Sequence, residues 1–423
     1  MVEQLNYISF QSTISSGFWF ELREKKLHEY KLDESAKPIQ GFYTNTDRPN
    51  LPCRLSLDHA SFGDETATPA LYFNSPGTLY NKNTIEGFKS SNLKLLMSNE
   101  GLKVKEAIES GSALKNPSIL NSFFVLCFGD LKKHTFYYLM GFPVRRKKNQ
   151  ITLLSKTTLK DTSEKEASIT KGINSWCECN AKLPPFFVLE ESQGNSLAYK
   201  HEVHKLENVN SLLLNKTNLI FAFCDPSSST NYPASALKNY LDLIQFHWGQ
   251  HFNNEFNILC YRERFNAGQR QISHSIILKL RLQIVDKYSP FYGWEKNGNG
   301  KIAPKTANLS SLMDPEKLAE SSVSLNLKLM QWRLMPALQL DMIANTKCLL
   351  LGSGTLGCNV ARNLLGWGVK NITMLDCGKV SFSNPVRQTL FEFSDCHVEG
   401  GKPKAQAAAD KLKKIFPGLF YFI

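Results

Sequence analysis

The chain reads Lys347-Cys-Leu-Leu-Leu-Gly-Ser-Gly-Thr-Leu-Gly357, an apolar run that passes directly into three closely spaced glycines. The apolar run predicts a short strand, and apolar residues at spacings of three and four after the glycines predict an amphipathic helix. A second apolar run, Ile372-Thr-Met-Leu375, predicts another strand that ends at Asp376. Asp376 follows Gly357 at close to the roughly 20 residues typical of a dinucleotide-binding βαβ unit. The sequence therefore predicts such a unit here.

The glycines of this unit also indicate a ligand. Gly352, Gly354 and Gly357 permit a tight turn and let backbone amides approach a phosphate at the helix N-terminus. The carboxylate of Asp376 can accept hydrogen bonds from ribose hydroxyls. A glycine turn with a purely structural role is the alternative. The order of strand, glycines, helix, strand and acid favours a nucleotide site.

The residues after the second strand bear on which nucleotide binds. Ser383-Asn-Pro-Val-Arg-Gln388 and Gly401-Lys-Pro-Lys404 bring further cations to the same crevice. Arginine and lysine are the side chains that hold a triphosphate, so this pattern favours ATP. Two alternatives remain at this point. Arg387 and Lys404 could be solvated surface charges, and the glycine motif alone also suits an NAD-dependent oxidoreductase.

Composition excludes several other classes of protein. A chain of 423 residues is expected to form two or three domains. The net charge of +12 is scattered along the chain, which favours a lysine-rich surface over a nucleic-acid site. The ten cysteines form no disulfide or zinc-binding pattern. Neither a signal peptide nor a transmembrane segment is apparent, so we expect a reduced, cytoplasmic protein.

Residues 1–288 read as a mixed α and β domain. Strands are predicted at Phe123–Phe128, Phe136–Leu139, Phe186–Leu189, Leu219–Phe223 and Ser273–Val285, and a helix with Pro233 in its first turn is predicted to run to Trp248. Two histidine pairs, His247 with His251 and His201 with His204, have spacings seen in metal sites, but we interpret all four as surface residues. Turn-forming residues predict a linker over 289–314. A helix capped by Asp314 is predicted to follow and to end near Pro336.

Several motifs resemble the autophagy-related protein 7 family, the ubiquitin-like modifier-activating enzymes of autophagy, which have ThiF/MoeB-like adenylation domains. In the C-terminal part the similar stretches are Leu349-Leu-Leu-Gly-Ser-Gly-Thr-Leu-Gly-Cys-Asn-Val-Ala-Arg362, Gly366-Trp-Gly-Val369, Ser383-Asn-Pro-Val-Arg-Gln388, Phe391-Glu-Phe-Ser-Asp-Cys396, Gly401-Lys-Pro-Lys404 and Lys414-Ile-Phe-Pro417. Upstream, the stretches Asp314-Pro-Glu-Lys-Leu-Ala-Glu-Ser-Ser322, Leu325-Asn-Leu-Lys-Leu-Met330, Trp332-Arg-Leu-Met-Pro336 and Asp130-Leu-Lys-Lys133 resemble the same family.

The resemblance implies a distinctive mixed α+β N-terminal domain at 1–288, which recruits conjugating enzymes. It also implies the first part of a Rossmann-like, ThiF-type α/β adenylation domain at 315–423. Members of the family use ATP and magnesium to adenylate the autophagy-related modifiers 8 and 12. They then form a thioester and pass the modifier to autophagy-related conjugating enzymes 3 and 10. They are homodimers of the cytoplasm and the preautophagosomal structure.

The same resemblance implies roles for individual residues. Gly352, Gly354 and Gly357 would line the nucleotide, Asp376 would hold ribose, and the phosphates would be contacted by Asn384, Arg387 and Lys404. Arg333 would reach a phosphate, as an arginine does in related adenylating enzymes. The resemblance implies no nucleic-acid partner.

The family pattern continues past Ile423 with a magnesium-binding aspartate, zinc-binding cysteines and the catalytic cysteine. We therefore expect a truncated chain with no catalytic cysteine and no metal ligand, in which dimerisation is not assured. The partial sheet is expected to leave its second strand and the apolar residues 419–423 unpaired. A non-catalytic module that binds conjugating enzymes is the alternative to an active enzyme.

Overall fold

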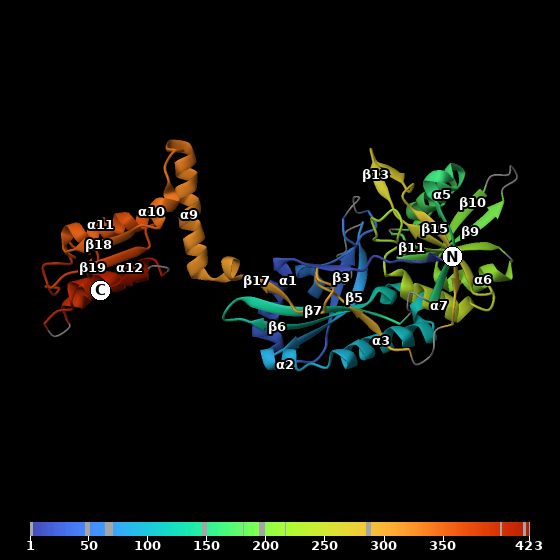
Figure 1. The fold of residues 1–423 in the computed structure, drawn as a ribbon, viewed down its shortest axis with the longest axis horizontal. Helices are drawn as coiled ribbons and strands as arrows, with labels where there is room; N and C mark the ends of the chain where they lie inside the picture. The colour runs from blue at the N-terminus through green and yellow to red at the C-terminus, as the bar shows by residue number, and fades with distance from the viewer. Residues whose placement is uncertain are drawn as a thin grey trace. The chain divides into compact units, whose positions relative to one another are not determined.

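The computed structural model describes residues 3–46, 51–63, 71–145, 150–180, 182–193, 199–215, 217–284, 289–397, 400–417 and 420–422 (Figure 1). The chain forms two compact units. One comprises Met1–Leu131 and Phe136–Ala307, and the other comprises Lys132–Thr135 and Asn308–Ile423.

Unit 1 contains two large mixed sheets in the described part of the chain. One has the order β1 (Glu3–Gln4), β8 (Ile151–Thr158), β15 (Ile276–Leu282), β12 (Glu255–Tyr261), β11 (Asn218–Cys224), β9 (Phe186–Gln193) and β10 (Tyr199–His204). The other has the order β16 (Tyr292–Trp294), β7 (Thr135–Val144), β6 (Phe123–Asp130), β5 (Phe73–Lys82), β3 (Lys37–Tyr43), β4 (Arg54–Leu57) and β2 (Gln11–Ile14), with β17 (Lys305–Asn308) beside β7. A small hairpin pairs β13 (Arg264–Asn266) with β14 (Gln269–Gln271).

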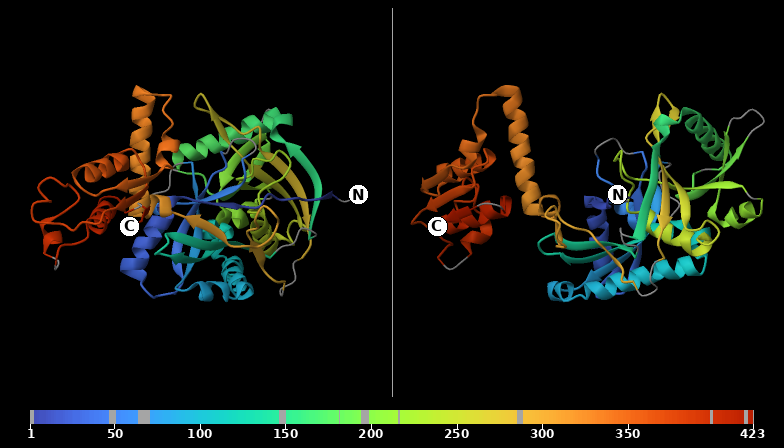
Figure 2. Two further views of the ribbon diagram at one scale, coloured as in Figure 1. Left: turned by 60° about the vertical axis from the view of Figure 1, so that its left-hand side comes forward. Right: turned by 45° about the vertical axis from the view of Figure 1, so that its right-hand side comes forward.

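Helices cover these sheets. The longer ones are α1 (Ser16–Lys25), α3 (Leu93–Glu109), α5 (Ser163–Cys179) and α7 (Leu237–Trp248), and the shorter ones are α2 (Ile85–Lys89), α4 (Ser112–Lys115) and α6 (Val209–Leu214). Helix α5 packs across β10, as both views of Figure 2 show. A Cβ on Gly172 of α5 would lie only 2.3 Å from the carbonyl oxygen of His201, so glycine permits this close approach.

The apolar runs predicted as strands are confirmed, except that the run predicted over Ser273–Val285 forms a strand only over Ile276–Leu282, because Ser273 and His274 lie in a turn. The run Phe123–Cys127 is at most 1% exposed, and β15 alternates buried and partly or fully exposed residues as its period of two predicts. Val285, the predicted end of that strand, lies outside the described residues. Helix α7 begins at Leu237, so the prediction that Pro233 lies in its first turn was wrong. Pro233 instead precedes the helix, where its carbonyl oxygen accepts a hydrogen bond from the Ile8 amide.

The segment predicted to be a linker contributes to a sheet of unit 1. Strands β16 and β17 both lie within 289–314 and pair with β7. Glu295 accepts hydrogen bonds from the Ser12 amide at 2.8 Å and from its hydroxyl at 2.6 Å, and Lys305 contacts the same carboxylate at 2.5 Å. Glycines and asparagines predicted turns here, and the turns lie between these strands. Local composition did not reveal that β16 and β17 pair with β7, which is distant in sequence.

Unit 2 is built on a small parallel sheet. Its elements are α8 (Ser310–Met313), α9 (Pro315–Leu334), α10 (Leu340–Ala344), β18 (Lys347–Leu351), α11 (Thr355–Gly366), β19 (Asn371–Leu375), α12 (Lys404–Ile415) and β20 (Phe420–Phe422). The predicted helix cap is confirmed, because Asp314 accepts a hydrogen bond from the Glu316 amide. The helix ends at Leu334, two residues before Pro336, as predicted.

The sheet of unit 2 differs from the sequence-based expectation at its edge. Strand β20 pairs in parallel with β19, so the prediction that the second strand and the apolar C-terminal residues lie unpaired was wrong for residues 420–422. Leu419 and Ile423 lie outside the described residues. Among the described residues of unit 2, one face of the sheet is covered, and it includes the fully buried Ile372 and Met374. On the other face, Leu349 is 61% exposed and Leu351 is 76% exposed.

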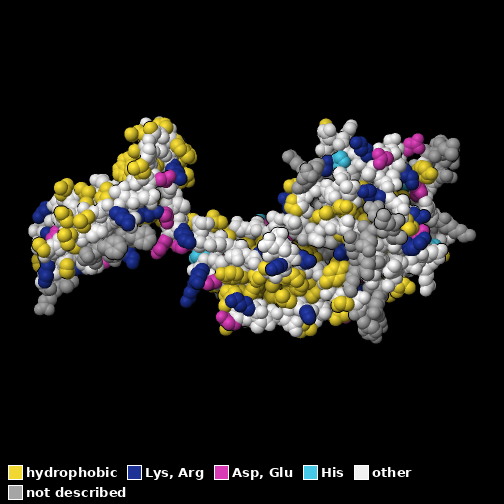
Figure 3. Space-filling view, in the orientation of Figure 1, with side chains coloured by type: hydrophobic (Ala, Val, Ile, Leu, Met, Phe, Trp, Pro, Cys, Tyr) yellow, Lys and Arg dark blue, Asp and Glu magenta, His cyan; other side chains and the backbone are white. Residues whose placement is uncertain are grey.

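Helix α9 carries an unusual amount of exposed apolar surface (Figure 3). None of its described residues is buried, although Ala319 and Val323 pack partly against the core of unit 2. Trp332 is 62% exposed and Leu334 is 75% exposed. Across the described residues, we find no helix that combines the length and apolar character required to span a bilayer.

Candidate nucleotide site

The glycine-rich loop, residues 352–354, connects β18 to α11 in unit 2, and Gly357 follows in the first turn of that helix. Gly352 has φ +105°, a conformation that L side chains rarely adopt, and its amide donates a hydrogen bond to the Leu375 carbonyl oxygen at 2.7 Å. Gly354 caps α11 with extended backbone angles, and a Cβ built there would have no atom within 4 Å. The loop therefore leaves open space beside its backbone at the start of a helix, where an anion is favoured.

Gly357 has a different role from the other two glycines. A Cβ at this position would lie 1.9 Å from the carbonyl oxygen of Gly352. The residue therefore allows the first turn of α11 to pack against the loop itself. Gly357 shapes the loop, whereas Gly354 leaves its surface open.

Asp376 lies at the end of β19 beside the loop. One carboxylate oxygen accepts a hydrogen bond from the Ser353 amide at 2.7 Å, and the other accepts one from the Gly378 amide at 2.7 Å. These contacts hold the carboxylate between the two turns that follow β18 and β19. An ionised carboxylate has about four lone-pair sites, so it retains capacity to accept further hydrogen bonds.

Arg387 reaches the loop from the segment after β19. Its Nη1 donates a hydrogen bond to the hydroxyl of Thr355 at 2.7 Å, although 32 residues separate the two in sequence. The side chain is otherwise exposed. This contact places a guanidinium beside the first turn of α11, where it can meet an anion together with the loop amides.

Lys404 and Asn384 complete the cluster from two further segments. The Lys404 amide donates to the Gly378 carbonyl oxygen at 2.9 Å, and its side-chain stem passes over Gly378, which places it close to Asp376. Asn384 is 5% exposed, and its side-chain oxygen accepts a hydrogen bond from the Ser381 amide at 3.0 Å. Asn384 thus fixes the turn that carries Arg387. In this geometry it is a supporting residue rather than an exposed ligand.

Arg333 is the predicted site residue that the structure does not bring to the loop. It lies in the last turn of α9, and its side chain is exposed. None of the contacts found among the described residues joins it to the glycine-rich loop.

Three polar groups in this part of unit 2 were not predicted from the sequence. They are the Thr355 hydroxyl, the fully buried Ser353 hydroxyl and the amide of Gln388, which is 2% exposed. In the described part of the chain, Ser353 Oγ and Gln388 Oε1 have no hydrogen-bond partner. Buried polar groups are nearly always satisfied, so these two atoms suit a polar ligand or water. Gln388 belongs to a stretch that the sequence already singled out, but only its neighbours were assigned roles.

The cysteines near the site differ in exposure. Cys358 is buried beneath the loop, and its thiol donates to the Ser353 carbonyl oxygen at 3.3 Å. Burial raises the pKa of this thiol, which disfavours the thiolate. Cys396 is also buried, Cys348 is partly buried and Cys377 is exposed. The prediction that Cys358 is a structural residue agrees with its position.

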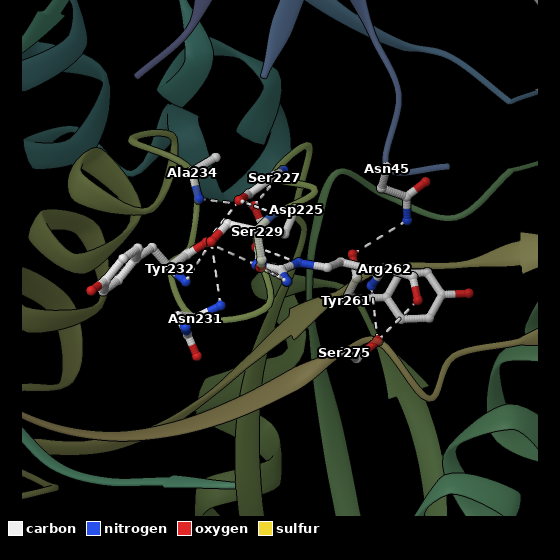
Figure 4. Close-up of polar contacts among 10 residues, drawn as sticks. All are labelled: Asn45, Asp225, Ser227, Ser229, Asn231, Tyr232, Ala234, Tyr261, Arg262 and Ser275. Atoms are coloured by element: carbon white, nitrogen blue, oxygen red, sulfur yellow. Dashed lines mark hydrogen bonds and ion pairs between the residues drawn. The ribbon is translucent and has the colours of Figure 1, made fainter. Parts of the chain in front are cut away.

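Unit 1 contains a separate, buried polar cluster (Figure 4). Arg262 donates to Asp225 Oδ2 through Nε at 3.0 Å and Nη2 at 2.8 Å, and both side chains are at most 6% exposed. Nη2 also donates to the Tyr232 carbonyl oxygen at 3.0 Å, and Nη1 donates to that of Ser229. The other Asp225 oxygen accepts from the amides of Ser227 and Ala234 at 3.0 Å each. With its partners satisfied, this cluster fixes the 225–234 loop.

Of the four histidines predicted to lie on the surface, only His251 is fully exposed. His201 is 2% exposed, so interpreting it as a surface residue was wrong. Its Nδ1 lies 2.9 Å from the Ser168 hydroxyl of α5. His247 is half-buried, and its Nε2 lies 2.9 Å from the Ile108 carbonyl oxygen. Burial lowers the pKa of His247.

Comparisons with known proteins match both units. The family model described as the N-terminus of the ubiquitin-like modifier-activating enzyme ATG7 matches residues 5–313, and the ThiF family model matches residues 325–420. The human ubiquitin-like modifier-activating enzyme ATG7 is 42% identical over 99% of this chain, and the atg7 protein of Dictyostelium discoideum is 39% identical over 99%. The chain spans 60% and 61% of the lengths of these two relatives.

A solved structure is also similar. The crystal structure of the Kluyveromyces marxianus Atg7NTD–Atg10 complex contains a chain that is 26% identical, with a TM-score of 0.50. The similarity covers 74% of the present chain and all of that one. It supports the mixed fold of unit 1.

Proposed function

Since the chain belongs to the ATG7 family of ubiquitin-like modifier-activating enzymes, we propose that unit 2 binds ATP and supports adenylation of a ubiquitin-like modifier. The observation that carries this proposal is the meeting of the open glycine-rich loop, Asp376 and Arg387 at one end of the sheet. The partners proposed are the autophagy-related modifiers 8 and 12. ATP supplies the adenylyl group that activates the C-terminal carboxylate of the modifier.

The residues of the site suit the parts of ATP. Open backbone at Gly354 and the start of α11 offer amides to phosphate oxygens. The carboxylate of Asp376 is held in place to accept from ribose hydroxyls, since the Ser353 and Gly378 amides fix its orientation. Arg387 and Lys404 supply positive charge, which favours a triphosphate over a nicotinamide cofactor. Magnesium is expected to accompany the nucleotide, and we assign it no ligand in this chain.

After adenylation, the proposed function continues with transfer of the modifier to a cysteine as a thioester. It needs a cysteine that can form a thiolate and reach the adenylated carboxylate. We assign this role to no cysteine of the present sequence. Cys358 in particular is buried under the loop with a raised pKa. Zinc binding by cysteines is likewise assigned to no residue here.

Unit 1 is proposed to recruit conjugating enzymes. The supporting observation is its similarity to an Atg7 N-terminal domain that was crystallised with Atg10. The alternative function, a module that binds conjugating enzymes without adenylation, rests on the same observation. Titration of the full chain with autophagy-related protein 10 tests recruitment. Absence of binding would overturn the proposed role of unit 1.

The experiment that separates the alternatives is ATP–pyrophosphate exchange by the purified chain, with and without each modifier. Exchange that depends on the modifier is expected if the chain adenylates. A folded chain that binds ATP without exchange would favour the non-catalytic module. NADH binding tighter than ATP binding would instead favour an oxidoreductase.

A further inference from the structure

Strands β9 and β10 of unit 1 place three metal-binding side chains on one face of a hairpin. Successive side chains on a strand point to opposite faces, so His201 and His204 diverge while Glu202 and His204 share a face. Glu202 is paired directly with Glu190 of β9 across the ladder. The sequence draws attention to two histidines three residues apart, but the strand instead brings one of them together with two glutamates.

The three side chains lie within reach of one ion. One ligand atom from each of Glu190, Glu202 and His204 can be chosen so that all lie within 4.8 Å of one another. Nε2 of His204 lies 3.0 Å from an oxygen of Glu190. Zinc–ligand bonds of about 2.0–2.2 Å in a tetrahedral site require ligand atoms roughly 3.4 Å apart, so small side-chain rotations suffice. No other such group of three was found among the described residues.

The surroundings of these side chains favour a defined geometry. The His204 side chain is 23% exposed and that of Glu190 is 20% exposed, so both are held by the sheet while remaining accessible. The Glu202 side chain is 49% exposed. Two adjacent, hydrogen-bonded strands fix the backbone positions of all three residues, which reduces the entropy lost when an ion binds.

We propose that Glu190, Glu202 and His204 form a Zn²⁺ site that joins β10 to β9. One imidazole and two carboxylates are ligands that zinc accepts, and their two negative charges neutralise the ion. Three protein ligands leave a fourth position for water. Strand β10 is the last in the order of its sheet, so the ion cross-links an outer strand to its neighbour.

Lys200 has a small effect on the affinity of this site. Its ammonium pairs with the carboxylate of Glu202 on the same face, with side chains 67% and 49% exposed. Zinc binding must displace this ion pair. Because exposed pairs are weak, the displacement costs little, and removal of Lys200 tightens zinc binding by about two- to fivefold.

The test is a Zn²⁺ titration of the full chain, freed of metal by a chelator and kept reduced. We expect one equivalent to bind and to slow hydrogen exchange of the β10 amides. Glu190→Gln and His204→Gln should each weaken this binding by about 100-fold or more, and Lys200→Ala should tighten it. The matched control is His251→Gln, which removes an exposed histidine near the end of α7 and should leave binding unchanged.

The exposed thiols Cys179 and Cys377 provide the competing explanation, since zinc also binds thiolates. Binding that survives both ligand variants, or that fails to protect the β10 amides, would overturn the proposal. Absence of binding by the unsubstituted chain would overturn it as well. Because the side chains lie on the surface of the hairpin, circular dichroism should show each variant folded. If Glu190→Gln or His204→Gln does not fold, Glu202→Gln, at the most exposed ligand, provides a further variant.

Discussion

The guanidinium of Arg387 donates a hydrogen bond to the hydroxyl of Thr355, so a cation from one segment is attached to the first turn of the helix that follows the glycine-rich loop. An arginine has five N–H donors, and this contact uses one of them. Among the described residues we find no other contact of this guanidinium, so its remaining donors can meet phosphate oxygens. Thr355 therefore acts as a positioning residue for Arg387 in the proposed ATP site.

Thr355→Val should weaken ATP binding about fivefold, because it removes an acceptor whose hydrogen bond is worth about 1 kcal/mol at an exposed site. Thr355→Ser retains the hydroxyl and should restore the affinity. Calorimetric titration with ATP measures both. A loss of affinity in Thr355→Ser but not in Thr355→Val would mean that the methyl group, rather than the hydroxyl, matters.

Gly354→Val should leave unit 2 folded and abolish ATP binding. The position has extended angles and no atom within 4 Å of a Cβ, so a side chain fits but occupies the space beside the backbone. Thermal unfolding and ATP titration separate the two effects. Unchanged ATP affinity would show that the loop is not the site.

Gly357→Ala is the contrasting variant. Its Cβ would lie 1.9 Å from a backbone oxygen, so the loop must shift at a cost of about 1–3 kcal/mol. Its melting temperature should fall below that of Gly354→Val. The reverse order would contradict the different roles assigned to the two glycines.

Arg262→Met should lower the free energy of unfolding of unit 1 by about 3–5 kcal/mol, because it leaves the buried Asp225 carboxylate without its cation. Urea titration measures the loss. The control is Arg281→Met, which breaks the exposed pair with Glu255 and should change stability little. The double variant Asp225→Asn with Arg262→Met should recover part of the loss, as both charges are then removed.

Glu191 should make unit 1 sensitive to acid. Contact with His201, together with Lys165, lowers its pKa from 4.5 to about 2. Its carboxylate therefore stabilises the fold fully above about pH 5, and this contribution of up to about 3 kcal/mol is lost as the pH falls toward 2. Glu191→Gln should flatten the dependence of unfolding free energy on pH between 5 and 2. Glu178→Gln, at an exposed residue of α5, should retain the slope.

Local patterns predicted the elements around the nucleotide site. The glycines, the apolar periods and the acid after β19 all lie within about thirty residues, and each carries its own conformational signal. Contacts between distant segments gave no such signal. Examples are the bond from Arg387 to Thr355 and the 37-residue separation of Asp225 and Arg262.

The histidines show a second limit. Spacing alone suggests that His201 and His204 act together, but the period of the element decides which side chains share a face. On β10 that period is two, so His201 turns toward α5 and His204 toward Glu190. Helix α9 shows a related limit. The spacing of its apolar residues predicted the helix, but it did not predict that these residues are exposed.

The contact between Ser12 and Glu295 spans 283 residues, which bears on how the protein folds as it is made. Synthesis at about 5–20 residues per second separates the appearance of these two residues by roughly 15–60 s. Until Glu295 leaves the ribosome, the amide and hydroxyl of Ser12 lack their carboxylate partner. Strand β2, which carries Ser12, therefore gains this contact only after the last strands of its sheet have been made, so the folding of unit 1 on the ribosome is completed late.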